Sequence, residues 1–359
     1  MPRNKVLITA LTIILLSVML IMITTCGYNG QPENGSDDDA DTSANITDIG
    51  RTMLVIYSTL APYVASPIIT TFQERYNITV AIHTATTAQT LSRLRDEAIS
   101  PQADILWGAS VQAVTPYLHL LEDFTSANEP YMIPGHENTT GRVTSFTANA
   151  GLLIVNTYLI GDIEIRGYKC LLNPALSGQI AFAYPTAASL PFNHLINQLF
   201  AMGSGGLNSG WDYIQQFISN TDGIIKSDFT AVHNGVIDGD FIVGLTCEET
   251  FFRHMAADAP VHAVYMDEGI MPAPMVVSIV NGTINRDGAE AFINFVTSHE
   301  VQAFLELNLR RRAVRSDVQP LGIPVGNADI NWLPANTEYI LTYRDMWIEQ
   351  FWDMWMAQH

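Results

Sequence analysis

Short apolar segments that end in small or hydroxyl-bearing residues alternate with helix-forming segments through most of this chain. In its first third, residues 53–57, 78–82 and 103–107 have the length and composition of buried strands. Apolar residues at helical spacing follow the first two, over 67–76 and around 91–98. A strand–loop–helix order of this kind predicts a parallel α/β sheet.

The same order starts again after residue 145. Further strands are predicted at 151–155, 179–184, 241–245 and 274–280, and further helices at 195–201, 211–219 and 289–307. Two α/β units in a chain of 359 residues predict two lobes with a cleft between them. We expect lobe 1 to contain 52–143 plus 270–359 and lobe 2 to contain 146–264. Two crossovers, near 144–149 and near 265–269, would form the hinge.

The N-terminus has the pattern of an export signal. Arg3 and Lys5 precede an apolar run from Val6 to Ile23, and Cys26 follows directly after two threonines. This end resembles a bacterial lipoprotein signal, in which the cysteine becomes the lipidated first residue. The run is also long enough for a retained membrane anchor, so both alternatives stay open. Either way, residues 1–26 place the body outside the cytoplasmic membrane, anchored to it, in the periplasm or at the cell surface.

Residues 27–50 are polar and acidic, with three consecutive aspartates at 37–39. Because this stretch has too few apolar residues to form a core, we expect a disordered tether between the anchor and the folded body.

The strongly negative net charge limits the kinds of molecule that this protein can bind. The chain has 17 Lys and Arg residues against 36 Asp and Glu residues, for a net charge of −19. A surface of this sign repels nucleic acid, so we expect no nucleic-acid partner. It does not exclude an anionic ligand, because backbone amides in a cleft bind anions locally. The basic cluster at Arg310–Arg312 and Arg315 is expected to pair with carboxylates of the lobes rather than with a partner protein.

The sequence does not decide whether the two cysteines of the folded body form a disulfide. Beyond Cys26, the exported body contains Cys170 and Cys247, which either pair or remain free thiols. Neither a C-x-x-C nor an H-E-x-x-H spacing occurs in the sequence, so we expect no built-in metal and no cofactor.

Serine and threonine occur where strands end and helices begin. In open α/β sheets, ligands bind beyond the carboxyl ends of the strands, where helix N-termini present free N–H groups. Each of these hydroxyls has the alternative interpretation of a helix N-cap. As a group they predict recognition of phosphate or sugar oxygens. The candidate ligand-binding residues are Ser58, Thr59, Thr84, Thr86, Thr87, Ser110, Thr186, Ser189, Ser227, Thr230 and Thr246.

Several segments, in order along the chain, resemble signature stretches of periplasmic binding proteins of the ferric-iron, phosphonate and sugar-phosphate type. They are 101–110 (PQADILWGAS), 173–181 (NPALSGQIA), 231–239 (AVHNGVIDG), 311–318 (RRAVRSDV) and 329–347. The resemblance covers about residues 52–350. It implies a two-lobed type II fold with a hinge, a small-molecule ligand, and delivery of that ligand to an ABC permease. It also implies a monomeric binding protein rather than an enzyme.

The resemblance favours one ligand class over another. Ferric-binding relatives have adjacent tyrosines after the strand predicted at 241–245, whereas this chain has Thr246-Cys247-Glu248-Glu249 there. The segment is more similar to relatives that bind hexose phosphates. In that interpretation Glu248 accepts hydrogen bonds from sugar hydroxyls and His233 donates to the phosphate. Ferric iron remains the alternative ligand, and a sensor or adhesion lipoprotein with the same fold remains the alternative class.

Overall fold

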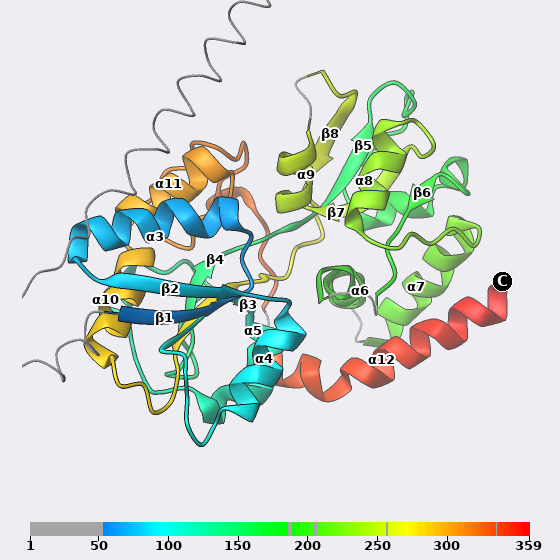
Figure 1. Cartoon of the computed structure of the whole chain (residues 1–359). Coiled ribbons are helices and arrows are strands. Elements are labelled where there is room, and N and C mark those ends of the chain that lie inside the picture. The colour runs from blue at the N-terminus through cyan, green and yellow to red at the C-terminus, as the bar shows by residue number, and fades with distance from the viewer. Residues whose placement is uncertain (1–52, 186–188, 204–206, 256–257, 335) are drawn as a thin grey trace, which may run out of the picture. The chain divides into compact units, whose positions relative to one another are not determined.

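The computed structural model describes residues 53–185, 189–203, 207–255, 258–334 and 336–359 (Figure 1). The predicted signal or anchor at 1–26, with Cys26, and the predicted tether at 27–50 lie outside these residues. Among the residues that are described, no helix has both the length and the apolarity needed to cross a membrane.

The first sheet contains five strands in the order β2-β1-β3-β9-β4. Strands β1 (Met53–Ser58), β2 (Thr79–Thr84) and β3 (Ile105–Ser110) are parallel, as the strand–loop–helix order predicts. Strand β9 (Met275–Ile279) pairs antiparallel with β3 and with β4 (Thr144–Thr147), so the parallel pairing predicted from residues 53–107 holds for β1, β2 and β3, and the complete sheet is mixed. β9 runs antiparallel to β3 because the chain enters the first sheet again from the side of the second sheet.

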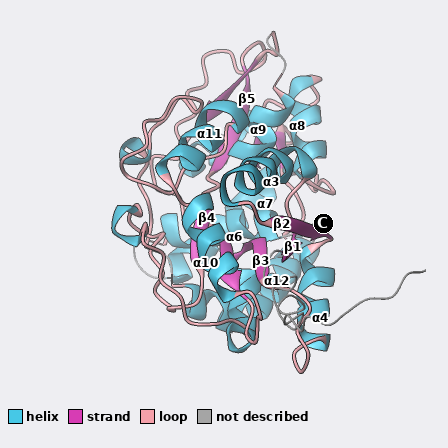
Figure 2. Cartoon of the chain, turned by 60° about the vertical axis from the view of Figure 1, so that its left-hand side comes forward, coloured by secondary structure: helices cyan, strands magenta, loops and turns pink. Residues whose placement is uncertain are grey.

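Helices cover both faces of the first sheet. Helices α3 (Pro62–Tyr76) and α4 (Thr87–Asp96) lie on opposite sides of β1 and β2 (Figures 1 and 2). The alternation within β1 explains this arrangement: Leu54 and Ile56 pack in one core cluster with α3, while Tyr57 packs in another with α4. The first of these clusters also includes residues of α10 (Arg286–Val296) and α11 (His299–Leu309).

Several helix boundaries differ from the sequence-based ones, and two of the differences have a clear local cause. Helix α3 begins at Pro62, five residues before the predicted start, because Val64 and Ala65 extend its buried stripe and proline is favoured in the first turn. The helix predicted over 289–307 is two helices, α10 and α11, since Ser298 caps the N-terminus of α11 by accepting from Val301 N.

The second sheet contains four strands in the order β6-β7-β5-β8. β6 (Ile180–Ala181) is parallel to β7 (Val243–Cys247), and β5 (Gly151–Asn156) is antiparallel to both β7 and β8 (Val261–Val264). The predicted strands at 151–155, 179–184 and 241–245 are all present, although the ladder at β6 is only two residues long.

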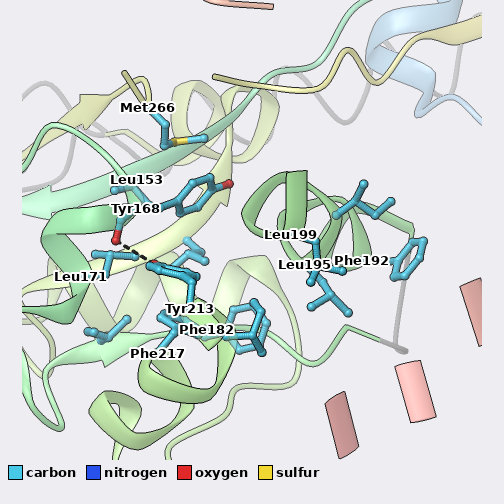
Figure 3. Close-up of a cluster of buried hydrophobic side chains, with 14 of the residues drawn as sticks. Leu153, Tyr168, Leu171, Phe182, Phe192, Leu195, Leu199, Tyr213, Phe217 and Met266 are labelled. Atoms are coloured by element: carbon cyan, nitrogen blue, oxygen red, sulfur yellow. Dashed lines mark hydrogen bonds between the residues drawn. The ribbon is translucent and has the colours of Figure 1, made fainter. Parts of the chain in front are cut away.

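Helices α6 (Ser189–Ala201), α7 (Leu207–Thr221), α8 (Phe229–Ile237) and α9 (Glu248–His254) pack with this second sheet. Figure 3 shows part of its larger core, in which Tyr168, Phe182 and Phe217 are fully buried. Short helical turns complete the chain: α5 (Val111–Val114) and 3-10 turns at Thr115–Leu120, Glu129–Tyr131, Tyr168–Leu172, Pro174–Leu176 and Asn327–Asp329.

Gly210 allows α6 and α7 to approach each other closely. A β-carbon on Gly210 would collide with the backbone carbonyl of Leu199 in α6. A side chain at this position would therefore push the two helices apart.

The C-terminal helix α12 (Thr337–Gln358) packs on the core of the second sheet. Trp347, Phe351 and Trp355 are buried in that cluster, so these aromatic residues dock the C-terminal helix. The predicted lobe 1 includes 270–359, but the side chains of α12 contact residues of the predicted lobe 2. The lobe boundaries themselves stay a prediction.

Three passes of the chain run between the two sheets. β4 leads into β5 through residues 148–150, and β8 leads into β9 through 265–274. The third pass follows α11, where Ala148 and Arg312 form an isolated antiparallel bridge with a 3.0 Å bond from Ala148 N to Arg312 O. The third pass therefore lies beside the first.

Candidate functional site

The ends of β1, β2 and β3 place hydroxyl groups along one edge of the first sheet. Ser58 is in register with Thr84 on β2 and with Trp107 on β3, and Ser110 is the last residue of β3. The predicted hydroxyl-lined edge is therefore present for Ser58, Thr59, Thr84 and Ser110.

Several of these hydroxyls make local bonds. Ser58 is fully buried, and its Oγ accepts from Leu60 N at 3.1 Å. Thr86 forms a capping box with Gln89 at the start of α4, and Ser110 Oγ accepts from Ala113 N at 3.3 Å. The N-cap interpretation holds for Thr86 and Ser110. Thr59 and Thr87 are half-buried and Thr84 is exposed.

Next to the second sheet, the side-chain carboxylate of Asp228 caps the N-terminus of α8. Asp228 Oδ1 accepts from Ala231 N at 2.9 Å, and Ser227 Oγ donates to Asp228 Oδ2 at 2.9 Å. These bonds, the backbone bond from Ala231 first, lower the pKa of Asp228. A bound anion at this helix start would meet that negative charge. Ser227 and Thr230 are exposed next to it.

The structure describes only part of the remaining candidate residues near the second sheet. Thr186 lies outside the described residues, and Ser189 begins α6 without a described side chain. Thr246 is fully buried in β7, and its carbonyl accepts from His194 Nε2 at 2.6 Å.

The carboxylate of Glu248 is occupied by protein groups. Its side chain is 2% exposed, and both carboxylate oxygens accept from Arg312, with Nε at 3.1 Å from Oε1 and 3.0 Å from Oε2. Tyr265 OH donates to Oε1 at 2.7 Å, and Ala150 N donates to Oε2 at 3.2 Å. The sequence assigns this carboxylate to sugar hydroxyls, but its acceptor sites are taken by the chain itself in this conformation. That assignment stays a prediction.

His233, on α8, is buried against the second sheet rather than exposed at the surface. The ring is fully buried, and neither ring nitrogen has a hydrogen-bond partner among the described residues. It packs against the rings of Phe251 and His254, at centroid distances of 6.0 and 5.5 Å. Burial, followed by the charge of His254, lowers the pKa of His233 to about 4. The ring is neutral at neutral pH, and its predicted donation to a phosphate remains untested.

Glu249 joins residues of both sheets. Arg311, on the third pass, donates through Nη2 to Glu249 Oε1 at 2.5 Å. Tyr63, in the first turn of α3, donates through its hydroxyl to the same oxygen at 3.5 Å. The end of β1 and the end of β7 are thus brought together through one carboxylate.

Three of the four arginines of the basic cluster form ion pairs with carboxylates, as predicted. Arg311 bonds Glu249, Arg312 bonds Glu248, and Arg315 bonds Asp317 at 2.7 Å. These ion pairs confirm the expectation for Arg311, Arg312 and Arg315, whereas the guanidinium of Arg310 lies over the ring of Phe252.

These charged residues line one tightly packed recess, which leaves no room for a water molecule. Its wall consists of Ala148, Asn149, Glu248, Glu249 and Arg310–Arg312. Three arginines face two glutamates, so the wall has one excess positive charge in a chain whose net charge is −19. Sequence reasoning found Glu248 and the arginines but missed Asn149, which no local pattern distinguishes from other crossover residues.

Within the described part of the chain Cys170 and Cys247 are both free thiols, so they do not pair with each other. Burial raises the pKa of the Cys247 thiol. In the part of the chain that the structure describes, no group of three or more His, Cys, Asp or Glu side chains is arranged to hold a metal ion.

Several solved structures with the same fold are described as binding proteins. The periplasmic binding protein AfuA from Actinobacillus pleuropneumoniae, with exogenous fructose-6-phosphate bound, has a TM-score of 0.66 and 20% identity, and the match covers 84% of this chain and 98% of that one. The apo ferric ion-binding protein A of Pasteurella haemolytica has a TM-score of 0.72 and 14% identity over 84% of this chain and 98% of that one. The fold is therefore the two-lobed α/β fold of type II periplasmic binding proteins, as predicted.

Sequence comparison identifies the family. An uncharacterised protein of Haemophilus influenzae is 24% identical over 264 residues, which are 69% of this chain and 74% of that protein. The family profile described as bacterial extracellular solute-binding protein matches residues 54–308. Because this match spans most of the chain, the protein belongs to the family of bacterial extracellular solute-binding proteins.

Proposed function

We propose that this protein captures a small oxyanionic solute, such as a sugar phosphate, outside the cytoplasmic membrane and delivers it to an ABC permease. The observation that carries the proposal is the cluster of Arg310–Arg312 beside Glu248 and Glu249, because its positive excess stands out in a strongly acidic chain. Local positive charge attracts an anion even when the net charge of the protein is negative.

Two further observations support an oxygen-rich ligand. The strand ends of the first sheet offer the hydroxyls of Thr59 and Thr84, which suit hydrogen bonding to sugar or phosphate oxygens. In addition, AfuA is described with a sugar phosphate bound.

The proposed mechanism is closure of two lobes around the solute. A ligand that contacts both sheets stabilises the closed arrangement and shifts the population toward it. Glu249 supports this idea because it already links Tyr63 of α3 to Arg311 of the third pass. The permease would then recognise the closed form.

A panel of ligands tests the proposal on the full-length chain in detergent. Thermal unfolding is measured with fructose 6-phosphate, inorganic phosphate, methylphosphonate and Fe(III), each at a concentration far above micromolar. A ligand at 100 times its Kd stabilises the fold by about 2.7 kcal/mol, which raises the Tm by several degrees. Neutron scattering with contrast-matched detergent measures closure as a smaller radius of gyration. If no compound raises the Tm, the proposed function is wrong.

Ferric iron is the alternative solute, since several proteins of the same fold are described as ferric-binding. Stabilisation by Fe(III) without a phosphate compound would establish that alternative. A second candidate function is sensing, because a structure with a TM-score of 0.69 and 23% identity is described as a two-component system protein that mediates signal transduction. Binding without transport in cells that express the matching permease would favour the sensor.

The proposed attachment to the membrane rests on Cys26 and the acidic segment at 27–50. Mass spectrometry of the protein from membranes distinguishes a chain that begins at a lipid-modified Cys26 from one that retains residues 1–25. A cysteine-to-alanine substitution at 26 is expected to abolish lipidation. Light scattering of the purified protein tests the expected monomer.

A further inference from the structure

A cavity beside the first sheet has room for a small molecule. Its volume is about 350 Å³, within the range of about 300–1,000 Å³ that is typical of small-molecule sites. None of the candidate ligand-binding residues lines it, and neither does any residue of the basic cluster at Arg310–Arg312 and Arg315. The cavity is therefore separate from the residues on which the proposed function depends.

The floor of the cavity lies at the edge strand β4 of the first sheet. Ser145 on β4 is in register with Val276 on β9, and both line the cavity together with Val143. Apart from the first residues of α5 and α12, the rest of the wall comes from loops, which include Pro272 and Pro274 of the second pass. Because loops rather than a long helix lie against this part of the sheet, a hollow remains there.

The polar side chains of the cavity wall carry only oxygen atoms. They are the carboxylate of Glu137 and the hydroxyls of Thr139, Ser145 and Thr337. Among the described lining residues there is no Lys, Arg or His, so no side chain of the wall neutralises Glu137. A carboxylate only accepts hydrogen bonds, and a hydroxyl accepts as well as donates. The wall therefore favours a ligand that brings donors and a positive charge.

The turn before Glu137 holds its carboxylate in place. Gly135 N donates to Glu137 Oε2 at 2.7 Å, which leaves Oε1 available to a second donor. Gly135 has a φ of 84°, in the left-handed region that favours glycine. A β-carbon on Gly135 would also lie 3.2 Å from Pro272 Cγ on the second pass. The glycine thus allows the turn to approach the second pass closely and fixes the carboxylate at the cavity.

We infer that this cavity is a binding site for a small organic cation, a primary ammonium group on a compact apolar body. The ammonium group has three donors and no acceptor, which matches the Glu137 carboxylate and the neighbouring hydroxyls. The apolar body packs against Val143, Val276 and the two prolines of the second pass. This site goes beyond the proposed function, because it requires neither the basic cluster nor an anionic solute. Its occupant contacts the second pass, which connects the two sheets.

Titration of the full-length chain in detergent tests the site with probes of similar shape and different charge. Benzylammonium is the cation, benzyl alcohol is its uncharged analogue and benzoate is an anion. Methyl NMR of labelled valines, assigned by replacing each valine with isoleucine in turn, locates the ligand. We expect benzylammonium to shift the Val143 and Val276 signals. Benzyl alcohol should bind about five-fold more weakly and benzoate more weakly still, since an ion pair with an exposed carboxylate contributes up to about 1 kcal/mol.

Matched variants test the role of the carboxylate. Glu137→Gln removes the charge but keeps an acceptor for Gly135 N, and it should weaken benzylammonium binding about five-fold and leave benzyl alcohol binding unchanged. The control is Glu74→Gln, at an exposed position of α3 outside the cavity wall, which should bind both probes like the wild type.

The comparison of the probes on the wild type decides the question if Glu137→Gln does not fold. Valine signals that stay unmoved at millimolar benzylammonium, equal affinities of the wild type for the cation and the alcohol, or unchanged cation binding in a folded Glu137→Gln variant each overturn the site. None of these outcomes affects the proposed function, and failure of every phosphate compound to bind leaves this site standing.

Discussion

Arg312 and Glu248 form a fully buried ion pair that joins the third pass between the sheets to the start of α9. The arginine side chain is 0% exposed and the glutamate 2%. Arg312 also donates to Asn327 Oδ1 at 3.0 Å and to Val325 O at 2.9 Å, so its guanidinium has acceptors on two sides. The pair lies where the chain passes between the sheets, and it fixes the position of α9 relative to that pass.

Breaking this pair from one side is expected to destabilise the fold strongly. Glu248→Gln leaves the Arg312 charge buried without a counter-ion, which costs about 3–5 kcal/mol. Urea unfolding measures the loss. The matched control is Glu300→Gln, which removes the exposed partner of Arg75 and should cost at most about 1 kcal/mol. Equal effects of the two substitutions would show that the buried pair has no special role in stability.

The free energy of unfolding should depend on Glu306, a carboxyl group on α11 close to that pair. It is 2% exposed, and its Oε2 has no partner among the described residues. Burial raises its pKa to about 7, although the charge of Arg312 opposes the rise and that of Glu248 adds to it. Native Glu306 therefore keeps a proton that the unfolded chain releases from about pH 4.5 upward.

Because the native state binds more protons in this window, this group makes stability fall as pH rises from about 4.5 to about 7, by at most about 1.4 kcal/mol per pH unit. Glu306→Gln should remove this slope, so that its stability relative to the wild type rises with pH and levels off above 7. Urea unfolding at intervals from pH 4.5 to 8 checks this. Glu300→Gln on the same helix serves as the control, and parallel curves for Glu306→Gln and the wild type would contradict the expectation.

His194 is expected to remain neutral well below neutral pH, with its proton on Nε2. Nε2 lies 2.6 Å from the carbonyl oxygen of Thr246, which only accepts, and Nδ1 lies 2.9 Å from the hydroxyl of Tyr168, which therefore donates to it. Burial lowers the pKa of His194 to about 4. Nitrogen NMR of the ring should show this tautomer unchanged from pH 8 to 5. A titration midpoint above 6 would rule out this hydrogen-bond pattern.

Acid should destabilise the protein through the buried histidines. Burial also lowers the pKa of His136 and of His233 to about 4. A histidine whose native pKa is depressed stabilises the fold fully above about pH 6.5, and this stability is lost as pH falls toward 4. His136→Gln should reduce the slope of stability against pH between 6.5 and 4. A slope identical to that of the wild type would exclude a contribution from this ring.

Removing an aromatic anchor of α12 should affect stability far more than removing an exposed apolar residue of the same helix. Trp347 is 1% exposed and packs in the core of the second sheet, so Trp347→Ala is expected to cost about 3–5 kcal/mol. Met356 is 72% exposed, and Met356→Ala should change stability by no more than about 0.5 kcal/mol. A small effect at Trp347 would mean that α12 is not docked in solution.

The local pattern of the sequence was sufficient for much of the fold. Alternating or continuous apolar runs predicted β1, β2, β3, β5, β7 and β9, and hydroxyl residues at the strand ends marked the edge of the first sheet. These features depend on neighbours within a few residues, where side-chain period and turn chemistry act. Boundaries were less certain, because Pro62 and Ser298 decide where α3 and α11 begin.

The site depends on contacts that no local pattern encodes. Glu248 meets Arg312 across 64 residues, and Asn149 meets Glu249 across 100. Whether a carboxylate or an amide is free for a ligand is decided by which partner the folded chain brings to it in a buried place, where each unmet polar group is costly. The sequence by itself determined the α/β elements and pointed to the family, whereas only the tertiary structure decided that the carboxylate of Glu248 is occupied by Arg312, Tyr265 and Ala150.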